Sequence, residues 1–550
     1  MTAGMTAGSL SRVERARLPL ARQVIDAVAV DHGVCVRPLP MRRVDTVTGE
    51  TEIVPAPCGA TLASVCPSCA ERARRLRMAQ CAAGWHLDHE PLPEQNPPTD
   101  EQKTLGQLRA DLEAVRADAE RDGNAEQIAD ADDLISQVDA ALTDTGVRGQ
   151  AAPDTRDRPR RTRSTRRRQD APDLPRLPVD RRTVGRTFTA PDGTVWRPSL
   201  FLTLTCPSYG PIVDGAPVDP DRYDYRRAAR DAIHFPKLID RFWQNLRRAV
   251  GWNVQYFAAL EPQRRLAPHL HAAIRGTIPR IVLRQVAAAT YHQVWWPAHD
   301  RPVYDRHRPP VWHELSGGYI DPDTGAVLPT WDEALDQIGP NDEPAHVARF
   351  GEQIRADGVT ANHRDAGRLI GYLTKYLTKS LDACHAIDSD RRRDHVERMA
   401  DALRYEPCSP GCANWLLYAV QPRNPRPGLV PGRCKGKAHR RDTLGFGGRR
   451  VLVSRSWSGK TLTDHRRDRL AWVRQQLAAG GGDSEEQAGP LADPGRSLWT
   501  LARPGEPDVP RREQLVLRAV ADRTAWRARL DAAIRTAGAG PPGSTLPAAA

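Results

Sequence analysis

The sequence predicts an α+β fold in which an antiparallel sheet is flanked by helices, and three observations support this. Residues 199–205 alternate in polarity and are rich in β-forming residues, so they predict a strand. Residues 254–260 and 269–275 predict two more strands, and the loop between them is short enough for a hairpin, which makes them antiparallel neighbours. Helical periodicity over residues 235–250 and 364–380 supplies the flanking helices.

The chain before this sheet changes composition several times. Residues 1–34 include a short amphipathic stretch, and residues 35–90 hold five of the ten cysteines. A Pro-rich segment follows, and then two heptad-like runs, led by Leu105 and Ile128, flank the turn Asp122-Gly123-Asn124. They predict an acidic helical hairpin, which serves as a spacer or a small interaction module. Eight arginines between Arg156 and Arg168 then mark an Arg/Pro-rich tract that we expect to be disordered.

Beyond residue 275 we expect a helix at 280–296, an irregular insertion at 301–345 and a second cysteine-bearing region near 405–440. A basic strand-plus-helix segment should end near residue 479, and residues 480–510 should be loose. Residues 514–535 are a candidate for one last helix. The expected parts are an N-terminal segment (1–34), a cysteine module (35–90), the acidic hairpin with the disordered linker (91–182), the sheet domain (183–400), a second cysteine-bearing basic module (401–480) and a flexible tail (481–550).

Net charge and composition indicate the class of binding partner and the cellular compartment. The 550 residues carry a net charge of +12, which favours a polyanion such as nucleic acid. The alternative is that a GC-rich genome simply encodes arginine often. No apolar run is long enough to span a membrane, and the N-terminus does not resemble a signal peptide, so we expect a cytoplasmic protein. In that reducing compartment, cysteines are more often metal ligands than disulfides.

A His-Leu-His sequence lies in the third predicted strand. Alternation places His269 and His271 on one face of the sheet, and the hairpin returns Glu261 beside them. Two imidazoles and one carboxylate can share a divalent metal ion and leave positions open for a phosphate oxygen and water. The alternative is a pair of ordinary strand histidines without a metal.

The helix predicted at 364–380 repeats the sequence Tyr-Leu-Thr-Lys. Tyr372 and Tyr376 lie one turn apart on one face, and Lys375 and Lys379 lie on the adjacent face. A phenolate can attack phosphorus when a metal activates the phosphate and cations favour ionisation of the phenol. The alternative is an amphipathic helix whose tyrosines are half buried in the core.

Two sets of cysteines have spacings that suit zinc. The first set is Cys58, Cys66 and Cys69, with Cys81 or His86 as the fourth ligand and Cys35 as a further candidate. The alternative for this set is free buried thiols. The second set is Cys408, Cys412, Cys434 and His439.

Basic residues surround the second pair of the second set, and they are Arg433, Lys435, Lys437, Arg440 and Arg441. With Trp415 and Tyr418 nearby, this region is a candidate reader of DNA, and a purely structural zinc staple is the alternative. Cys206 and Cys384 stand alone and are expected to be structural. The full prediction is therefore an antiparallel sheet with flanking helices, small zinc-binding modules and a disordered basic linker.

The strand 201–205, the His269-Leu-His271 sequence and the Tyr372/Tyr376 pair, in this order, resemble the three motifs of HUH rolling-circle initiators of the two-tyrosine type. The whole chain more closely resembles the replication initiators of actinobacterial plasmids and integrative elements. The runs from Cys58 to Cys69 and from Gly447 to Lys460 also look like theirs. The resemblance covers roughly residues 30–90 and 195–480.

This resemblance implies an HUH-type sheet, an Mg²⁺ or Mn²⁺ ion on His269 and His271, and nicking of single-stranded DNA at a duplex origin. Tyr372 or Tyr376 would form a covalent 5′-phosphotyrosine and leave a 3′-OH primer, with Lys375 or Lys379 orienting the phosphate. The chain lacks a GxxxxGK[ST] loop, so a host helicase and polymerase would be needed. Two alternatives stay open, a relaxase or transposase of the same chemistry and a zinc-containing, non-catalytic DNA-binding regulator.

Overall fold

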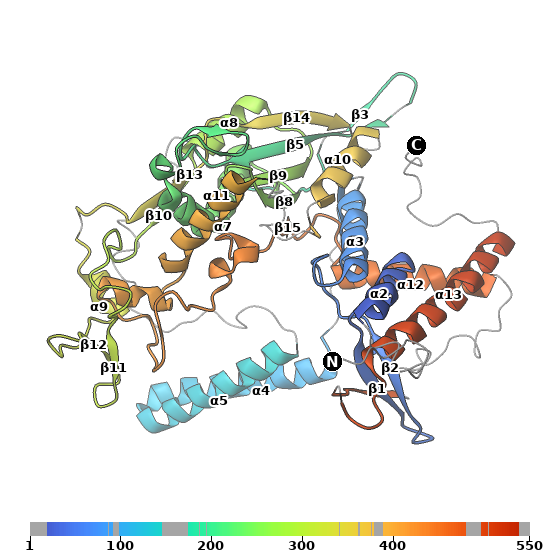
Figure 1. The fold of residues 1–550 in the computed structure, drawn as a ribbon, viewed down its shortest axis with the longest axis horizontal. Helices are drawn as coiled ribbons and strands as arrows, with labels where there is room; N and C mark the ends of the chain where they lie inside the picture. Colours follow the sequence, from blue (N-terminus) through green and yellow to red (C-terminus); the bar gives the residue numbers. More distant parts are fainter. Residues whose placement is uncertain are drawn as a thin grey trace, which may run out of the picture. The chain divides into compact units, whose positions relative to one another are not determined.

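In the computed structural model the chain divides into two compact units (Figure 1). One unit combines Met1–Leu92 with Gln169–Ala550, and the other is Pro93–Arg168. The structure describes residues 19–85, 87, 89–91, 98–145, 174–185, 187–193, 195–339, 341–360, 364–375, 377–378, 389–479, 497–503 and 505–537.

The smaller unit is a helical hairpin of α4 (Asp100–Asp122) and α5 (Ala125–Asp144). A capping box at Thr99 starts α4, and Gly123 ends it with φ of 67°, a left-handed conformation that glycine adopts without strain. Two ion pairs join the helices, Arg109 with Asp139 at 2.6 Å and Arg116 with Asp132 at 2.8 Å. The two heptad-like runs of the sequence thus form two paired helices.

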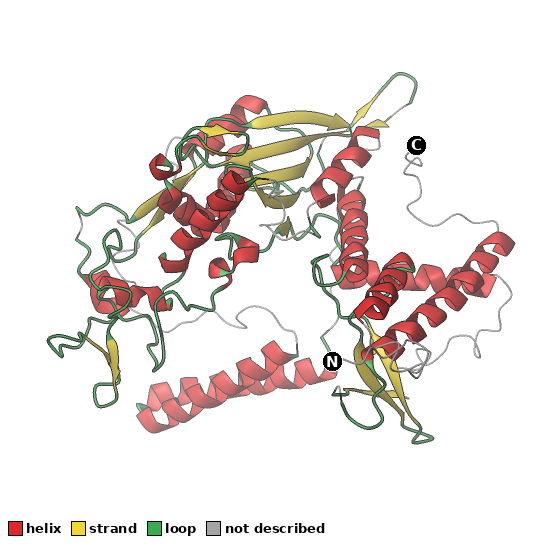
Figure 2. Ribbon diagram, in the orientation of Figure 1, coloured by secondary structure: helices red, strands yellow, loops and turns green. Residues whose placement is uncertain are grey.

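A five-stranded sheet forms the centre of the larger unit, and every neighbouring pair of its strands is antiparallel (Figure 2). The strand order is β14-β5-β9-β8-β15. The strands are β5 Pro198–Thr205, β8 Tyr256–Pro262, β9 Pro268–Arg275, β14 Arg355–Thr360 and β15 Val451–Val453. The predicted α+β class and its antiparallel hairpin are therefore confirmed.

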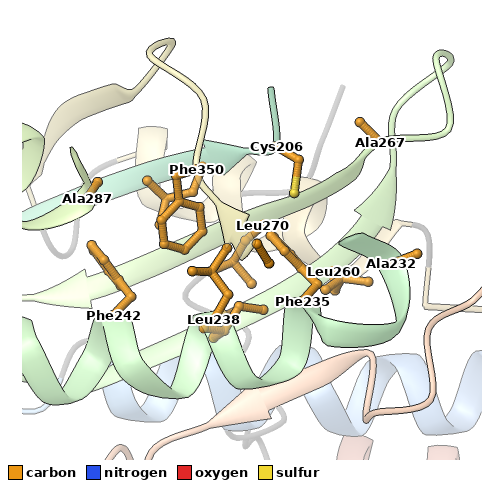
Figure 3. Packing of buried hydrophobic residues seen from close by; sticks show 14 of the residues in the cluster. Cys206, Ala232, Phe235, Leu238, Phe242, Leu260, Ala267, Leu270, Ala287 and Phe350 are labelled. Atoms are coloured by element: carbon orange, nitrogen blue, oxygen red, sulfur yellow. The ribbon is translucent and has the colours of Figure 1, made fainter. Parts of the chain in front are cut away.

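Helices α7 (Tyr225–Val250) and α8 (Arg280–Ala289) cover one face of this sheet. Figure 3 shows Phe235, Leu238 and Phe242 of α7 gathered against Leu260 and Leu270 of the sheet. All five side chains are at most 2% exposed, and burial of such a side chain contributes about 1.5–3 kcal/mol. This face is therefore a conventional core, and α7 starts at Tyr225 rather than at residue 235 as predicted.

Helices α10 (Arg364–Lys375) and α3 (Pro67–Trp85) cover the opposite face. Ile370 of α10 and Cys81 of α3 pack in one buried cluster with Phe201 and Phe257 of the sheet. The indole of Trp85 also donates a hydrogen bond to Ser199 Oγ at 2.7 Å. The N-terminal cysteine region is therefore joined to the central sheet through α3.

The prediction of a helix at 280–296 is correct up to Ala289 and wrong beyond it. α8 ends at Ala289, Thr290 has extended backbone, and β10 (Tyr291–Val294) pairs antiparallel with β13 (His346–Arg349). The β-branched Thr290 and a partner strand from a distant segment together favour extended chain here. Within the insertion at 301–345 the structure places β11 (Val311–His313), β12 (Gly318–Ile320) and α9 (Trp331–Asp336).

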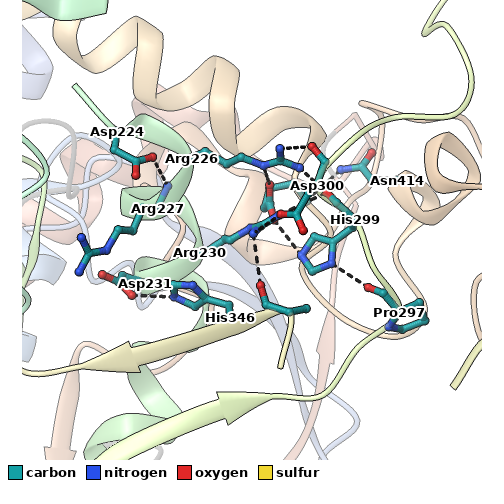
Figure 4. Close-up of polar contacts among 12 residues, drawn as sticks. Asp224, Arg226, Arg227, Arg230, Asp231, Pro297, His299, Asp300, His346 and Asn414 are labelled. Atoms are coloured by element: carbon teal, nitrogen blue, oxygen red, sulfur yellow. Dashed lines mark hydrogen bonds and ion pairs between the residues drawn. The ribbon is translucent and has the colours of Figure 1, made fainter. Parts of the chain in front are cut away.

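A buried polar cluster joins α7 to the segment after α11 (Asp390–Tyr405), as Figure 4 shows. Arg230 Nε donates to Glu406 Oε1 at 2.6 Å, and the same carboxylate oxygen lies 3.1 Å from His299 Nε2. Arg230 also donates to Asp300 at 2.9 Å. Because removing one partner would leave a buried charge unpaired, at a cost of about 3–5 kcal/mol, this cluster anchors the second cysteine region to the sheet.

The two ends of the described chain form one small layer. β16 (Ser497–Leu501), β1 (Leu39–Asp45) and β2 (Thr51–Ala56) make an antiparallel sheet, with Met41 opposite Leu501. Helix α13 (Arg512–Ala537) packs against β2, and helices α2 (Pro19–Asp31) and α12 (Leu462–Ala479) pack against α13. We expected loose chain at 480–510, but residues 497–501 form an edge strand because β1 offers them a partner.

The short elements are β3 Phe188–Thr189, β4 Val195–Trp196, β6 Ile212–Val213, β7 Ala216–Pro217 and the 3₁₀ turns η2 Pro220–Arg222, η4 Ala413–Tyr418, η5 Lys437–His439 and η6 Arg441–Thr443. In the described part of the chain, no helix combines the length and apolar character that a bilayer crossing requires.

Candidate metal centre and its tyrosine

Glu261, His269 and His271 come together at one end of the β8–β9 hairpin. Glu261 is the cross-strand partner of His269, so the hairpin brings the carboxylate back to the histidines as the sequence suggested. One ligand atom from each residue lies within 4.8 Å of the others, and His271 Nε2 lies 2.9 Å from Glu261 Oε1. Such a group can hold a metal ion.

The two histidines differ in their surroundings. His271 is 6% exposed, and its Nδ1 lies 3.0 Å from the hydroxyl of Thr203 on the adjacent strand β5. His269 Nδ1 is buried and has no hydrogen-bond partner among the described residues. Burial first, and then the neighbouring His271 and Arg265, lower the pKa of His269 to about 3, so this imidazole is neutral, as a metal ligand must be.

Tyr372 faces this group from α10. Its hydroxyl lies 3.1 Å from His271 Nε2, and its ring meets the imidazole edge-on with 4.9 Å between centroids. Ile370 and Leu373 are buried on the sheet side of α10, while Tyr372 remains 39% exposed. The hydroxyl is thus placed at the histidines while the ring stays accessible to solvent.

The other residues predicted on this helix are only partly described. Lys375 is the exposed last residue of α10. Tyr376 and Lys379 lie outside the described residues, as does the lone Cys384. The second lone cysteine, Cys206, is 1% exposed in the main core.

One cluster of thiols consists of Cys35, Cys58, Cys66 and Cys69, and we call it the four-cysteine group. The Sγ atoms of Cys58 and Cys69 are 3.8 Å apart, as are those of Cys35 and Cys66. Zn–S bonds of about 2.3 Å in a tetrahedron place sulfur atoms about 3.8 Å apart. These residues therefore fit a closed tetrahedral zinc site.

Cys81, one of our predicted ligands, is not part of the four-cysteine group. It is fully buried near the C-terminal end of α3, within the cluster that packs on the sheet. Cys66 and Cys69 lie at the start of α3, where the loop from Cys35 reaches them, and three further helical turns separate them from Cys81. Cys35, the further candidate from the sequence, takes that position, and the candidate His86 lies outside the described residues.

Cys408, Cys412, Cys434 and His439 form a second cluster, which we call the cysteine–histidine group. His439 Nδ1 lies 2.8 Å from the carbonyl oxygen of Leu403, and this contact directs Nε2 towards Cys412 Sγ, 3.4 Å away. Hydrogen bonds from Cys408 and then Cys412 lower the pKa of Cys434, which favours the thiolate that binds metal. All four residues chosen from the sequence spacing are brought together.

The five basic residues predicted to contact DNA surround the cysteine–histidine group, but three have partners within the protein. Arg440 pairs with Asp442 at 2.6 Å, Arg441 donates to Glu397 at 2.9 Å, and Lys437 contacts the carbonyl of Gly448. Arg433 and Lys435 belong to the same loop. The available positive charge in this region is therefore smaller than the sequence suggests.

Thr203 was not predicted from the sequence, and Cys35 was only a further candidate beside Cys81 and His86. Thr203 lies directly opposite His271 in the β5–β9 register, so the alternation of the strand at 199–205 was a signal that could have identified it. Cys35 precedes the β1–β2 hairpin, and only that hairpin returns the chain to Cys58. Its amide-to-sulfur contact from Cys58, at 3.3 Å, depends on a strand pairing that spacing alone does not reveal.

Fold and site together define a class, namely a mixed α+β protein with an antiparallel sheet, a His–His–Glu group beside a tyrosine, and two cysteine-rich groups fit for metal. Residues 21–522 match the family described as RepSA, replication initiator protein, pSAM2, and the chain belongs to that family. The resemblance to actinobacterial replication initiators is thereby confirmed.

One curated relative is a replication initiator protein from Streptomyces ambofaciens, which is 24% identical over 254 residues. The match covers 38% of this chain and 50% of the relative, so the chain spans about half the length of the curated relative it matches. No solved structure matches the chain.

Proposed function

We propose that this chain is an HUH-type endonuclease that starts rolling-circle replication by nicking one DNA strand at an origin. The observation that carries the proposal is the position of the Tyr372 hydroxyl, 3.1 Å from His271 Nε2, which itself lies 2.9 Å from Glu261. A nucleophile is thereby held at the residues that would bind metal and phosphate. Membership of a replication-initiator family supports the same role.

Glu261, His269 and His271 would hold Mg²⁺ or Mn²⁺. The fit rests on their convergence within 4.8 Å and on the buried Nδ1 of the half-buried His269, which has no hydrogen-bond partner among the described residues. Such an ion polarises a phosphoryl oxygen. Thr203 would keep the His271 ring oriented, because a hydrogen bond to the second ring nitrogen fixes a ligating histidine.

In the proposed step the Tyr372 oxygen attacks the scissile phosphorus and its phenolic proton is released. A tyrosyl O–P bond forms, the P–O3′ bond breaks, and the departing oxygen takes up a proton to become the 3′-OH primer. Tyr376 would attack the new junction later and rejoin the DNA. Lys375 and Lys379 would orient the phosphate and stabilise its negative charge.

The remaining parts receive supporting roles in this proposal. The HUH domain would comprise the predicted residues 183–400 and also β15, which lies in the predicted 401–480 module but pairs with β8 of the central sheet. The four-cysteine and cysteine–histidine groups would hold structural zinc. Arg433, Lys435, Lys437, Arg440 and Arg441 would contact origin DNA, which the protein would recognise as a duplex and cleave as a single strand. A host helicase and polymerase would extend the primer.

The test is incubation of the purified chain with an origin plasmid and a single-stranded origin oligonucleotide, with and without Mn²⁺. We expect nicked circles, a covalent protein–DNA adduct, and an adduct peptide that contains Tyr372 or Tyr376. An adduct at any other residue contradicts the site. Binding without cleavage of any substrate would instead favour the zinc-containing regulator, and transfer to a second DNA molecule without priming would favour a relaxase or transposase.

A further inference from the structure

Seven arginines outside the predicted site gather where α3, α12 and α13 meet. α12 packs against both α3 and α13 (Figure 1). The arginines are Arg72 and Arg77 of α3, Arg449 before β15, Arg466 and Arg469 of α12, and Arg523 and Arg527 of α13. We call this set the arginine surface.

Like charges repel within two groups of these side chains, one around Arg77 and one around Arg523. After burial, Arg449 and Arg466 lower the pKa of Arg77, and Arg527, Arg72 and Arg469 lower the pKa of Arg523. The Arg523 guanidinium also stacks on Trp526, 4.5 Å from the ring centroid, and its buried Nε has no hydrogen-bond partner in the described chain. Repulsion among like charges is relieved when an anion binds between them.

Carboxylates near the arginine surface are already paired with other basic residues. Glu71 binds Arg74 at 2.7 Å and Arg75 at 2.9 Å. On α12, Asp468 binds Lys460 at 2.8 Å, and Asp464 binds Arg467. Within the described residues, none of the seven arginines has a carboxylate partner, in contrast to Arg440 and Arg441 beside the cysteine–histidine group. Arg72 donates instead to Cys69 Sγ of the four-cysteine group, at 3.4 Å.

We propose that the arginine surface is the docking site for the phosphate backbone of duplex DNA. This inference rests on the proposed function for its ligand, since a nicking initiator must also hold the duplex beside its target. Guanidinium groups on several elements suit the phosphates of two strands. Single strands usually need aromatic platforms, and here Trp526 is half buried and covered by Arg523.

Helix geometry supplies a matched control. On α12, Arg466 and Arg469 point to one side, while Arg467 and Arg474 lie roughly 100° round the helix. On α13, Arg529 lies roughly opposite Arg527. The triple variant R466Q/R469Q/R527Q therefore removes three charges from the arginine surface, and R467Q/R474Q/R529Q removes the same charge elsewhere on the same helices.

The experiment measures binding of both full-length variants to a mixed-sequence duplex and to its single strands across a salt series, without added Mg²⁺ or Mn²⁺. We expect the test variant to bind duplex at least about tenfold more weakly. The slope of the logarithm of its binding constant against the logarithm of the salt concentration should also become less negative by about three, at roughly 0.9 per phosphate contact. The control should stay within about twofold, and thermal melts should show both variants folded.

Equal losses in the two variants, or a loss confined to single strands, would overturn the docking site. Unchanged duplex binding would mean that the arginine surface serves a different polyanion, which also refutes it. Since no cleavage is measured, absence of nicking in the activity assay would refute the proposed function and leave a selective loss of duplex binding standing.

Discussion

The His–His–Glu group and the four-cysteine group are both clusters of metal-binding side chains, but their surroundings differ. The sulfurs of the four-cysteine group face one another, and Cys35, Cys66 and Cys69 are buried. The His–His–Glu group has three ligands, and a partly exposed tyrosine stands beside it. Four closed ligands are typical of structural sites, and three ligands with open positions are typical of reactive ones. Under the proposed function, the number of candidate ligands and the neighbouring Tyr372, more than the mere presence of a cluster, distinguish the reactive group from the structural one.

The largest expected effect concerns the four-cysteine group. Cys35→Ser should lower the zinc content of the purified protein by one ion and unfold the layer of β1, β2 and β16, because a structural zinc site contributes on the order of 10 kcal/mol to folding. Zinc analysis and hydrogen exchange measure both. Cys81→Ala is the control, and it should keep all the zinc. Loss of zinc in the Cys81 variant and not in the Cys35 variant would show that Cys81 is the fourth ligand, as the sequence predicted.

The next effect concerns Tyr372, the proposed nucleophile. Tyr372→Phe should slow the first nick by at least about a thousandfold, because the attacking oxygen is gone while the ring still packs on Phe201 and His271. The rate is measured on a single-stranded origin oligonucleotide with Mn²⁺. Tyr291→Phe, in strand β10 outside the five-stranded sheet, is the control and should cut normally. If Tyr372→Phe cuts at the normal rate, Tyr376 makes the first nick.

A smaller effect should come from Thr203, which would orient the candidate metal ligand His271. Thr203→Val removes the hydroxyl 3.0 Å from His271 Nδ1 and should weaken Mn²⁺ binding about 10- to 100-fold. Calorimetric titration gives the affinity, and Thr203→Ser should restore it. An unchanged affinity in the valine variant would mean that β5 does not orient the histidine.

The smallest effect tests the cysteine–histidine group. A Cβ at Gly436 would lie 2.9 Å from Cys408 Sγ and 3.3 Å from Cys434 Sγ, so Gly436→Ala should weaken zinc binding about tenfold, from overpacking of roughly 1–2 kcal/mol. Competition with a zinc chelator measures this affinity. Gly447→Ala, whose Cβ would meet its nearest neighbour at 3.9 Å, is the control. Equal affinities would show that the loop adjusts freely.

Local patterns predicted the elements that position the site, and distant pairing decided those that were missed. The β8–β9 hairpin and the alternation of His269 and His271 follow from nearby residues, so the convergence of Glu261 with the histidines was predictable. β14 was missed because Arg355–Thr360 is polar and contains Gly358, and only the edge of β5 makes it a strand. β10 was likewise assigned to a helix, since its partner β13 is distant in sequence. Similarly, Cys35 depends on a hairpin that spacing does not specify.

The pairing of β1 with β16 also affects how the chain is made. The ribosome releases β1 and the four-cysteine group early, but their partner strand and Val516 of α13, which packs against Cys35, Cys66 and Cys69, emerge after the whole central sheet. Until then β1 has an unpaired edge, which is prone to aggregation. We therefore expect the layer of β1, β2 and β16 to mature after the central sheet, so that a chain interrupted before residue 497 would leave the ribosome with its central sheet formed and this layer incomplete.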